Sequence, residues 1–437
     1  MFAFAKELKT SLSNIIYEMS QNRKEFVRAP DKDFTRTRKL DFEKLIKYML
    51  IMGSNTIQKE LYALCDYSDQ CITKSGFLQQ RDKLKEDTME FLFHRFVRVI
   101  PKQKKTKNYR LLACDGCRIP IFTNPKDTDT HHIVHSKAKK GCNHLLLHAL
   151  FDLQNNQYVD ATVMPFNLSG EAKELEKMMS RLENPTDTII IADRGYECYN
   201  TFAKAIETHT KFVIRVKDSA SSCGILSNQN LPTTQVFDVD LKLNLTKSQK
   251  LYHSNPQKYK LLYSSSRFEF FSKENPAYLL NLRIVRFLVG DNYECIVTNL
   301  DRKEFSSEEI KELYHQRWGI ETSFRELKHT IGLLHLHSKK TKHISQEIFA
   351  RLTLYNFCEA IAEQIILKEK RKQYVYQLNH TMAVHFCCQF LKRTWFYGNE
   401  IDIESLFQQN ILPIRLNRYF LRDIRKRGYM SFLYRPF

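Results

Sequence analysis

The stretch TIIIADRGY at residues 188–196 joins an apolar, β-branched run to an acid, Asp193. Such a run predicts a buried strand that ends at the acid. Helix-like sequence flanks it at 171–182 and 200–209, and KFVIRV at 211–216 predicts the next strand. This alternation is typical of a sheet with helices packed on its faces.

Three further strands are predicted upstream of this unit, at 111–117, 144–153 and 157–165. The first of them, LLACDGC, is a short apolar run that ends in an acid, Asp115. The order is then three strands, a helix, a strand, a helix and a strand. That order favours an α/β fold with a mixed sheet.

Residues 1–100 have a helical pattern, with a long amphipathic segment at 75–100 and Ser54 as a candidate helix cap. They suit a DNA-docking domain and an ordinary helical bundle equally well. Further along, residues 217–305 interrupt the alternation and predict a β-rich insertion with a hairpin about its Gly-Asp-Asn turn. Helical pattern returns at 306–333.

A second long amphipathic helix is predicted at 345–370, and the tail at 414–437 is strongly basic. The whole chain of 437 residues holds 68 Lys and Arg against 49 Asp and Glu, a formal net charge of +19. A polyphosphate backbone is the simplest partner for that charge. No Gly-rich nucleotide loop or nucleophile elbow is present, so those classes of enzyme are disfavoured.

The number of cysteines and the hydropathy of the chain indicate the cellular compartment in which the protein works. The 11 cysteines are scattered along a long chain, which favours a reducing compartment over a disulfide framework. No apolar run approaches the roughly 20 residues of a membrane span. We therefore expect a cytoplasmic protein with no membrane partner.

Two acids at the ends of apolar runs, Asp115 and Asp193, are candidate ligands for a hard divalent cation such as Mg²⁺. Two such ions about 4 Å apart can activate a hydroxyl and stabilise the departing oxygen of a phosphodiester. Taken alone, an acid at the end of a strand is more often a turn former or a helix cap.

Helical geometry supplies a third carboxylate at 306–333. At about 100° per residue, one polar stripe contains five residues: Tyr314, Arg317, Glu321, Arg325 and Lys328. An adjoining apolar stripe contains Leu313, Ile320, Phe324, Leu327 and Ile331. The polar stripe suits metals next to phosphates, but it also suits an exposed face held by a Glu321–Arg325 pair.

The spacing Tyr314-x2-Arg317-x3-Glu321-x6-Lys328 resembles the Y-R-E-K signature of the insertion-sequence-four family of DDE transposases. Asp193-Arg194-Gly195-Tyr196 resembles the second-acid motif of that family, and Cys114-Asp115-Gly116 its first-acid strand. The resemblance spans roughly residues 105–335.

The resemblance implies a ribonuclease-H-like core in which Asp115, Asp193 and Glu321 bind two Mg²⁺ ions, with Mn²⁺ as a possible substitute. It also implies that Tyr314, Arg317 and Lys328 contact DNA, and we expect the same of Arg325, which shares their stripe. Some relatives flip a base onto an aromatic residue; candidates here are Trp318, Phe268, Phe270, Phe271 and Tyr278.

The domain organisation implied by pattern and resemblance has four parts. They are a helical DNA-binding domain at 1–100, a catalytic core at 105–216 and 306–370, a β-rich insertion at 217–305, and a basic helical C-terminal region at 371–437.

The function implied is that of a bacterial or archaeal, nucleoid-associated DNA transposase. It would bind the terminal inverted repeats of its element, cleave the ends by two-metal chemistry, and join them to target DNA, acting as a homodimer in the synaptic complex. Two alternatives stay open: a metal-dependent nuclease that does not join strands, and a transposase-derived DNA-binding protein. A zinc site built from Cys114, Cys117, Cys142 and His144 is a further, weaker reading of the sequence.

Overall fold

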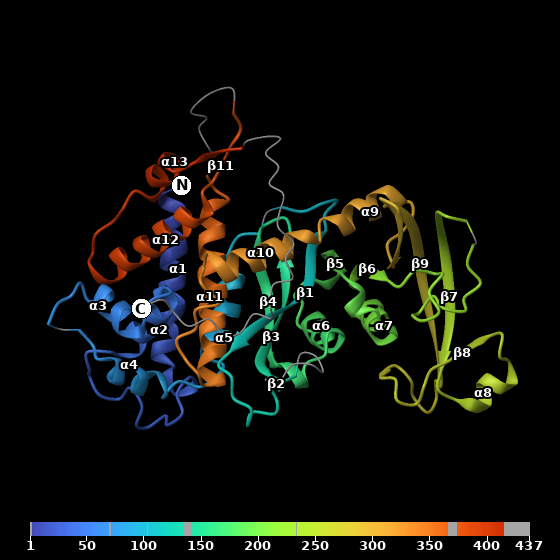
Figure 1. Cartoon of the computed structure of the whole chain (residues 1–437), viewed down its shortest axis with the longest axis horizontal. Coiled ribbons are helices and arrows are strands. Elements are labelled where there is room, and N and C mark those ends of the chain that lie inside the picture. Colours follow the sequence, from blue (N-terminus) through green and yellow to red (C-terminus); the bar gives the residue numbers. More distant parts are fainter. Residues whose placement is uncertain are drawn as a thin grey trace.

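The structure is a computed structural model that describes residues 2–69, 71–102, 104–133, 141–232, 234–365 and 374–414. Figure 1 shows a helical bundle, built from both ends of the described chain, beside a large sheet that extends away from it. No helix among the described residues is long and apolar enough to cross a bilayer. Apart from Ile414, the predicted basic tail lies outside the described residues.

One ten-stranded sheet organises the centre of the molecule. Five strands of its first half are those expected from the alternation of apolar runs: β1 (Arg110–Ile121), β3 (Cys142–Asp152), β4 (Gln157–Pro165), β5 (Thr188–Ala192) and β6 (Lys211–Val216). β3 pairs antiparallel with β1 and β4, whereas β5 runs parallel to both β1 and β6. The short β2 (His131–His132) pairs with the start of β3. The predicted mixed α/β fold is confirmed.

Four more strands come from the stretch predicted to be β-rich: β7 (Phe237–Thr246), β8 (Tyr259–Leu261), β9 (Ala277–Val289) and β10 (Asn292–Thr298). β9 and β10 form the expected hairpin, and Gly290 supplies the positive φ of +58° that its turn requires. β10 pairs with β6, so these strands extend the central sheet instead of forming a separate one. The helix α8 (Gln249–Ser254) lies between β7 and β8 along the chain.

Helices cover both faces of the sheet (Figure 1). One face carries α6 (Glu171–Met179) and α7 (Tyr199–Glu207), which share a buried cluster with Leu112 and Cys114 of β1. The other face carries α9 (Ser307–His315), α10 (Trp318–His329) and α11 (Thr341–Ala362). There Leu111 packs with α9, and Ala113 packs with α10 and α11. Alternate residues of β1 thus serve two different cores.

The helical bundle contains α1 (Phe2–Gln21), α2 (Phe42–Ile51), α3 (Ile57–Leu64), α4 (Lys74–Arg81), α5 (Thr88–Val99), α12 (His380–Phe396) and α13 (Ile403–Gln409). A two-stranded sheet, β11 (Tyr376–Gln377) with β12 (Leu412–Pro413), adjoins α12 and α13. Short 3-10 turns lie at η1 (Arg23–Glu25), η2 (Phe166–Leu168), η3 (Pro185–Asp187) and η4 (Arg194–Tyr196).

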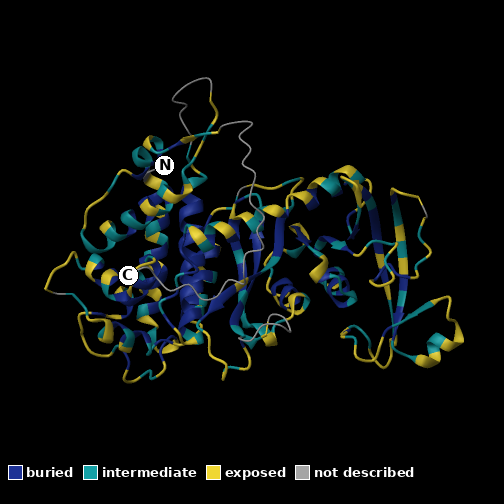
Figure 2. Ribbon diagram, viewed as in Figure 1, coloured by how far each residue is buried: buried dark blue, intermediate teal, exposed yellow. Residues whose placement is uncertain are grey.

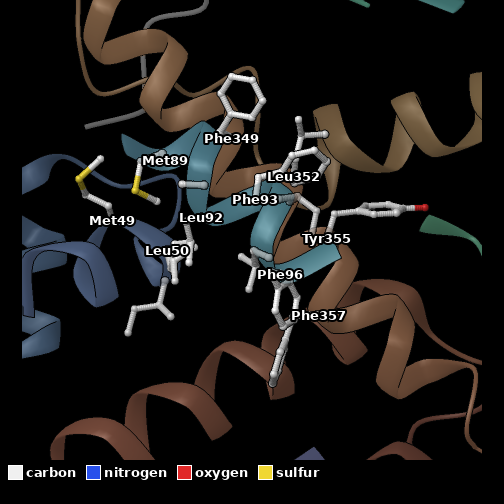
Figure 3. Close-up of a cluster of buried hydrophobic side chains, with 14 of the residues drawn as sticks. Met49, Leu50, Met89, Leu92, Phe93, Phe96, Phe349, Leu352, Tyr355 and Phe357 are labelled. Atoms are coloured by element: carbon white, nitrogen blue, oxygen red, sulfur yellow. The ribbon is translucent and has the colours of Figure 1, made fainter. Parts of the chain in front are cut away.

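α11 differs from the amphipathic helix predicted at 345–370, because it is buried on nearly all sides (Figure 2). Helices α2, α5 and α12 and strand β4 surround it. Figure 3 shows Phe93 and Phe96 of α5 among the side chains of α11, including Phe349 and Phe357. A helix that other elements surround on all sides needs no polar face, so the spacing of its apolar residues does not show how far it is buried.

The helix predicted at 75–100 is divided into α4 and α5. The break has a structural cause: Leu84 forms an antiparallel β-bridge with Val27, and the N–H of Lys85 donates to the carbonyl of Phe26. Likewise Thr56, not Ser54, caps α3 by accepting a hydrogen bond from the N–H of Lys59.

Candidate active site

Asp115 lies in the middle of β1, not at the end of a strand as the sequence predicted. The strand continues because its pairing with β3 extends along its whole second half. Asp115 shares its face with Ala113 and Cys117, both of which pack in the cluster that includes α10. The N–H of Gly116 donates to Oδ1 of Asp115 at 2.8 Å. The carboxylate is therefore fixed on the α10 side of the sheet.

Asp193 follows directly after β5, where the sequence predicted it. The parallel register of β1 and β5 pairs Cys114 with Ala192. Asp115 and Asp193 are each the next residue along, so the two acids leave neighbouring strands at the same level of the sheet.

Asp193 is held by several donors. Its Oδ1 accepts from the N–H of Arg194 at 2.6 Å and from Nε of Arg215 at 2.7 Å. Its Oδ2 accepts from Nη2 of Arg215 at 3.2 Å, and the hydroxyl of Tyr314 donates to Oδ1 at 3.3 Å. Tyr314 therefore links α9 to the second acid.

The two aspartates differ in their electrostatics. Burial raises the pKa of Asp115 to about 6, and the Glu321 carboxylate adds to the rise against the opposing charge of Arg317. Burial acts on Asp193 too, but the hydrogen bonds from its own turn and from Arg215 outweigh it and lower the pKa of Asp193. At neutral pH both groups are ionised, Asp193 more firmly than Asp115.

Glu321 lies in the first turn of α10, which packs on β1. Its Oε1 accepts from Nη2 of Arg317 at 2.8 Å, and Nη1 of Arg317 lies 3.9 Å from Oδ2 of Asp115. Arg317 also helps to lower the pKa of Asp193. One guanidinium thus bonds to Glu321 and lies close to Asp115, and Glu321 pairs with Arg317 instead of Arg325.

The single helix predicted at 306–333 forms two helices, because the backbone makes a tighter, 3-10-type turn between α9 and α10. The N–H of Arg317 donates to the carbonyl of Tyr314, three residues back instead of four. A Cβ on Gly319 would stand 2.6 Å from Cδ2 of Leu153, so glycine permits this close approach. The predicted apolar stripe is confirmed: Leu313, Ile320, Phe324, Leu327 and Ile331 are all buried.

The members of the polar stripe occupy different environments. Tyr314 and Arg317 are buried, at 4% and 5% exposed, whereas Arg325 faces solvent. Lys328 is half-buried beside the Cys117 thiol, where its charge opposes the burial that raises the pKa of that thiol. The structure therefore brings the Tyr and Arg of the signature to the acids instead of presenting them outward.

Trp318 is 61% exposed and follows Arg317 directly, with its ring 5.4 Å from that guanidinium. The other aromatic candidates pack against one another through ring contacts: Phe268, Phe270, Phe271 and Tyr278. Trp318 is thus the candidate that offers a free ring face next to the acids.

A fourth acid, Glu171, was not predicted from the sequence. It is the first residue of α6, and its carboxylate lies beside Gly116 and Gly195, the glycines that follow the two aspartates. The spacing of apolar and polar residues in α6 does not predict that Glu171 lies near the two aspartates. The only local signal is that a glycine follows each aspartate within two residues, which leaves room for another side chain.

The zinc site drawn from Cys114, Cys117, Cys142 and His144 does not form. Cys114 and Cys117 are buried on opposite faces of β1. The ligand atoms of Cys142 and His144 instead lie near His132, with the Cys142 Sγ 3.9 Å from Nε2 of His132 and 3.7 Å from Nδ1 of His144.

Comparison with known proteins places this geometry in a class. Residues 106–357 match the family described as "Transposase DDE domain". The match covers more than half of the 437 residues and includes all three acids. The class is that of nucleic-acid-cleaving enzymes which act on DNA in transposition. The chain belongs to the transposase DDE-domain family.

Among solved structures, the chain is similar to a piggyBac transposase in a synaptic complex with hairpin DNA. The sequence identity is 10%, the TM-score is 0.47, and the match covers 91% of this chain and 81% of the other. No protein of curated function matches the chain significantly.

Proposed function

We propose that this DNA transposase cleaves phosphodiester bonds at the ends of its own element with two divalent metal ions held by Asp115, Asp193 and Glu321. The observation that carries the proposal is that the buried guanidinium of Arg317 bonds to Glu321 and lies 3.9 Å from Oδ2 of Asp115. The parallel register of β1 and β5 brings Asp193 to the same level of the sheet as Asp115. The three acids come from two adjacent strands and the helix packed on them, so a rigid scaffold positions all three.

The donor set fits magnesium. Mg²⁺ prefers carboxylate oxygens and keeps coordination positions for water and phosphate. Burial is the main cause of the raised pKa of Asp115, and the Glu321 and Glu171 carboxylates add to it, so a cation bound there would stabilise the ionised form. Bound metal would activate the attacking hydroxyl and stabilise the departing oxygen.

The strand order supports a ribonuclease-H-like core. β1, β3 and β4 form an antiparallel unit, and β5 and β6 follow parallel to β1. The first acid then lies on the first of these strands, the second acid follows the fourth, and the third lies on a helix of the α9–α11 face. This is the arrangement that the sequence resemblance implies.

The residues around the acids have distinct roles in this proposal. Arg215 and Tyr314 orient Asp193 through the hydrogen bonds that they donate to it. Arg317 orients Glu321. The exposed ring of Trp318 precedes Glu321 on α10, and Arg325 and Lys328 follow it, so DNA next to the cleaved bond would contact them along this helix.

We further propose that the protein binds the terminal inverted repeats, assembles as a homodimer on two ends, and joins the freed 3′-hydroxyls to target DNA. The net charge of +19 supports a large contact with phosphates. Phosphoryl transfer requires the protein mainly to position the reactants and to stabilise charge. The acids and the neighbouring cations would do both, and no covalent protein nucleophile is needed.

An in vitro reaction tests the proposal. The full chain is incubated with Mg²⁺, a supercoiled target plasmid and linear DNA that carries the repeats flanking its coding sequence. We expect cleavage at the repeat ends and joining into the plasmid, and neither in Ca²⁺, which tolerates poor geometry that in-line transfer does not. Cleavage without joined product would identify a nuclease, and end binding without cleavage would identify a DNA-binding protein.

A further inference from the structure

We propose that Glu171 is a fourth acidic ligand of this metal site and that His148 is the residue that positions it. The inference rests on the proposed function, since it concerns the site formed by Asp115, Asp193 and Glu321. It adds one residue that neither the signature nor the strand order identifies.

Glu171 approaches the site from the opposite side of the sheet. It begins α6, which packs on the face away from α10. Two glycines leave space for its carboxylate beside the segments that carry the aspartates. Oε1 lies 3.4 Å from the point where a Cβ would stand on Gly116, and Oε2 occupies the place of a Cβ on Gly195. Any larger residue at position 195 would displace the carboxylate.

These glycines are the immediate neighbours of the two aspartates. Gly116 follows Asp115 directly, and Gly195 lies two residues beyond Asp193 in the turn η4. The Glu171 carboxylate therefore spans the gap between the two adjacent strands that carry the acids. Burial and the Asp193 carboxylate both raise the pKa of Glu171, in agreement with this proximity.

A second observation comes from His148 on β3, whose side chain is fully buried. Its Nε2 lies 2.5 Å from Oγ of Ser169, two residues before Glu171. Its Nδ1 lies 3.3 Å from the same Cβ point of Gly116 that Oε1 of Glu171 approaches. Among the described residues this Nδ1 has no hydrogen-bond partner.

Burying a polar atom without a hydrogen-bond partner is unfavourable, so the position of Nδ1 beside the Glu171 carboxylate indicates a hydrogen bond that orients this carboxylate. With Ser169 donating to Nε2, the imidazole carries its proton on Nδ1 and can donate it toward Oε1 of Glu171. Carboxylates that bind metals are commonly oriented by such an outer hydrogen bond. Ser169, His148 and Glu171 then form a chain that fixes the fourth ligand.

Binding of Mn²⁺ alone to the full chain tests the assignment, measured by titration calorimetry or by the loss of the free-ion EPR signal. Glu171→Gln keeps the shape of the side chain and removes its charge, and we expect the affinity for Mn²⁺ to fall at least tenfold. Glu183→Gln is the matched control, because Glu183 is an exposed acid just past α6 that pairs with Arg98. Its affinity should equal that of the wild type.

Asp193→Asn separates this inference from the proposed function. If Asp193→Asn loses Mn²⁺ binding while Glu171→Gln keeps it, Glu171 is not a ligand and the three-acid site stands. If both variants bind Mn²⁺ as the wild type does, or if the wild type binds none, the metal site itself is refuted together with its fourth ligand.

Two further comparisons use readouts that a merely structural role would not give. His148→Asn places an amide near the position of Nδ1 and should keep the affinity for Mn²⁺ within about threefold, whereas His148→Leu should lower it about tenfold. Gly195→Ala should lower both thermal stability and affinity. Adding Glu171→Ala should restore stability by removing the clash but leave the affinity low. Restored affinity in the double variant would overturn the proposal.

Discussion

Nη2 of Arg317 lies 2.8 Å from Oε1 of Glu321, one helical turn further along the chain. The same guanidinium lies 3.9 Å from Oδ2 of Asp115 and is only 5% exposed. Its charge is therefore directed at the acids and not outward. We therefore propose that the signature arginine supports two acids, whereas the sequence resemblance implied a contact with phosphate.

Replacing Arg317 should consequently impair the first nick as well as the later steps. In Arg317→Ala, Glu321 loses its partner and the pKa of Asp115 rises further, because Arg317 opposes the rise caused by burial. We expect first-strand nicking to fall about 10–100-fold and the acidic limb of its pH profile to move to higher pH. Arg317→Lys should recover part of the rate. Normal nicking with only joining impaired would return Arg317 to a DNA contact.

Neutralising the two aspartates should change stability in opposite directions. The raised pKa of Asp115 means that the metal-free folded state holds this proton more tightly than the unfolded state, so stability falls as pH rises from about 4 to about 6. The lowered pKa of Asp193 gives stability that is present at neutral pH and lost in acid.

At pH 7 without metal, Asp115→Asn should therefore raise the free energy of unfolding by about 1–3 kcal/mol. Asp193→Asn should lower it by about 1–3 kcal/mol, since the ion pair with Arg215 is weakened. Urea titrations of both variants at pH 4 and pH 7 measure the effect. Destabilisation by Asp115→Asn at pH 7 would show that this carboxylate is structural.

Trp318 offers an exposed ring next to the acids. If a DNA base stacks on it, Trp318→Ala should weaken binding of cleaved ends by about 1–3 kcal/mol. Because the ring is mostly exposed, the melting temperature should hardly change. Fluorescence anisotropy with nicked and intact duplexes measures the binding affinity. Trp395→Ala is the control, because the Trp395 indole donates a hydrogen bond to Ser13 within the helical bundle. Equal losses for both tryptophans would argue against stacking.

Arg325 is exposed on α10 and should bind phosphate, whereas Lys328 is half-buried beside β1. Arg325→Ala should lower the magnitude of the slope of log affinity against log salt by about 0.9 for each duplex phosphate that the arginine neutralises. Lys328→Ala should lower nicking more than binding. A salt slope that Arg325→Ala leaves unchanged would place the DNA elsewhere on the molecule.

Much of this site follows from local pattern. The strand ending at Asp193 and the apolar stripe of Phe324 and its neighbours were predictable, because period and β-branching report burial directly. The middle-strand position of Asp115 was not, since Gly116 and Pro120 are unfavourable in a strand and pairing with β3 decides where the strand ends.

Features that depend on tertiary packing could not be predicted from the sequence. The break between α9 and α10 lies beside the close approach of Gly319 to Leu153, and the enclosure of α11 arises from helices distant in the chain. Glu171 comes from the other face of the sheet, so no spacing along the chain relates it to Asp115. Such relations are set by packing, which a one-dimensional pattern does not record.

In the proposed mechanism, Asp115, Asp193 and Glu321 together hold the metal that DNA cleavage requires. Single-turnover cleavage of repeat-bearing DNA in Mg²⁺ tests it most directly, with Asp115→Asn, Asp193→Asn and Glu321→Gln assayed beside end binding. We predict that each variant binds the ends like the wild type and cleaves at least a hundredfold more slowly. Cleavage within a few-fold of the wild-type rate by any one of the three would contradict the assignment of that residue.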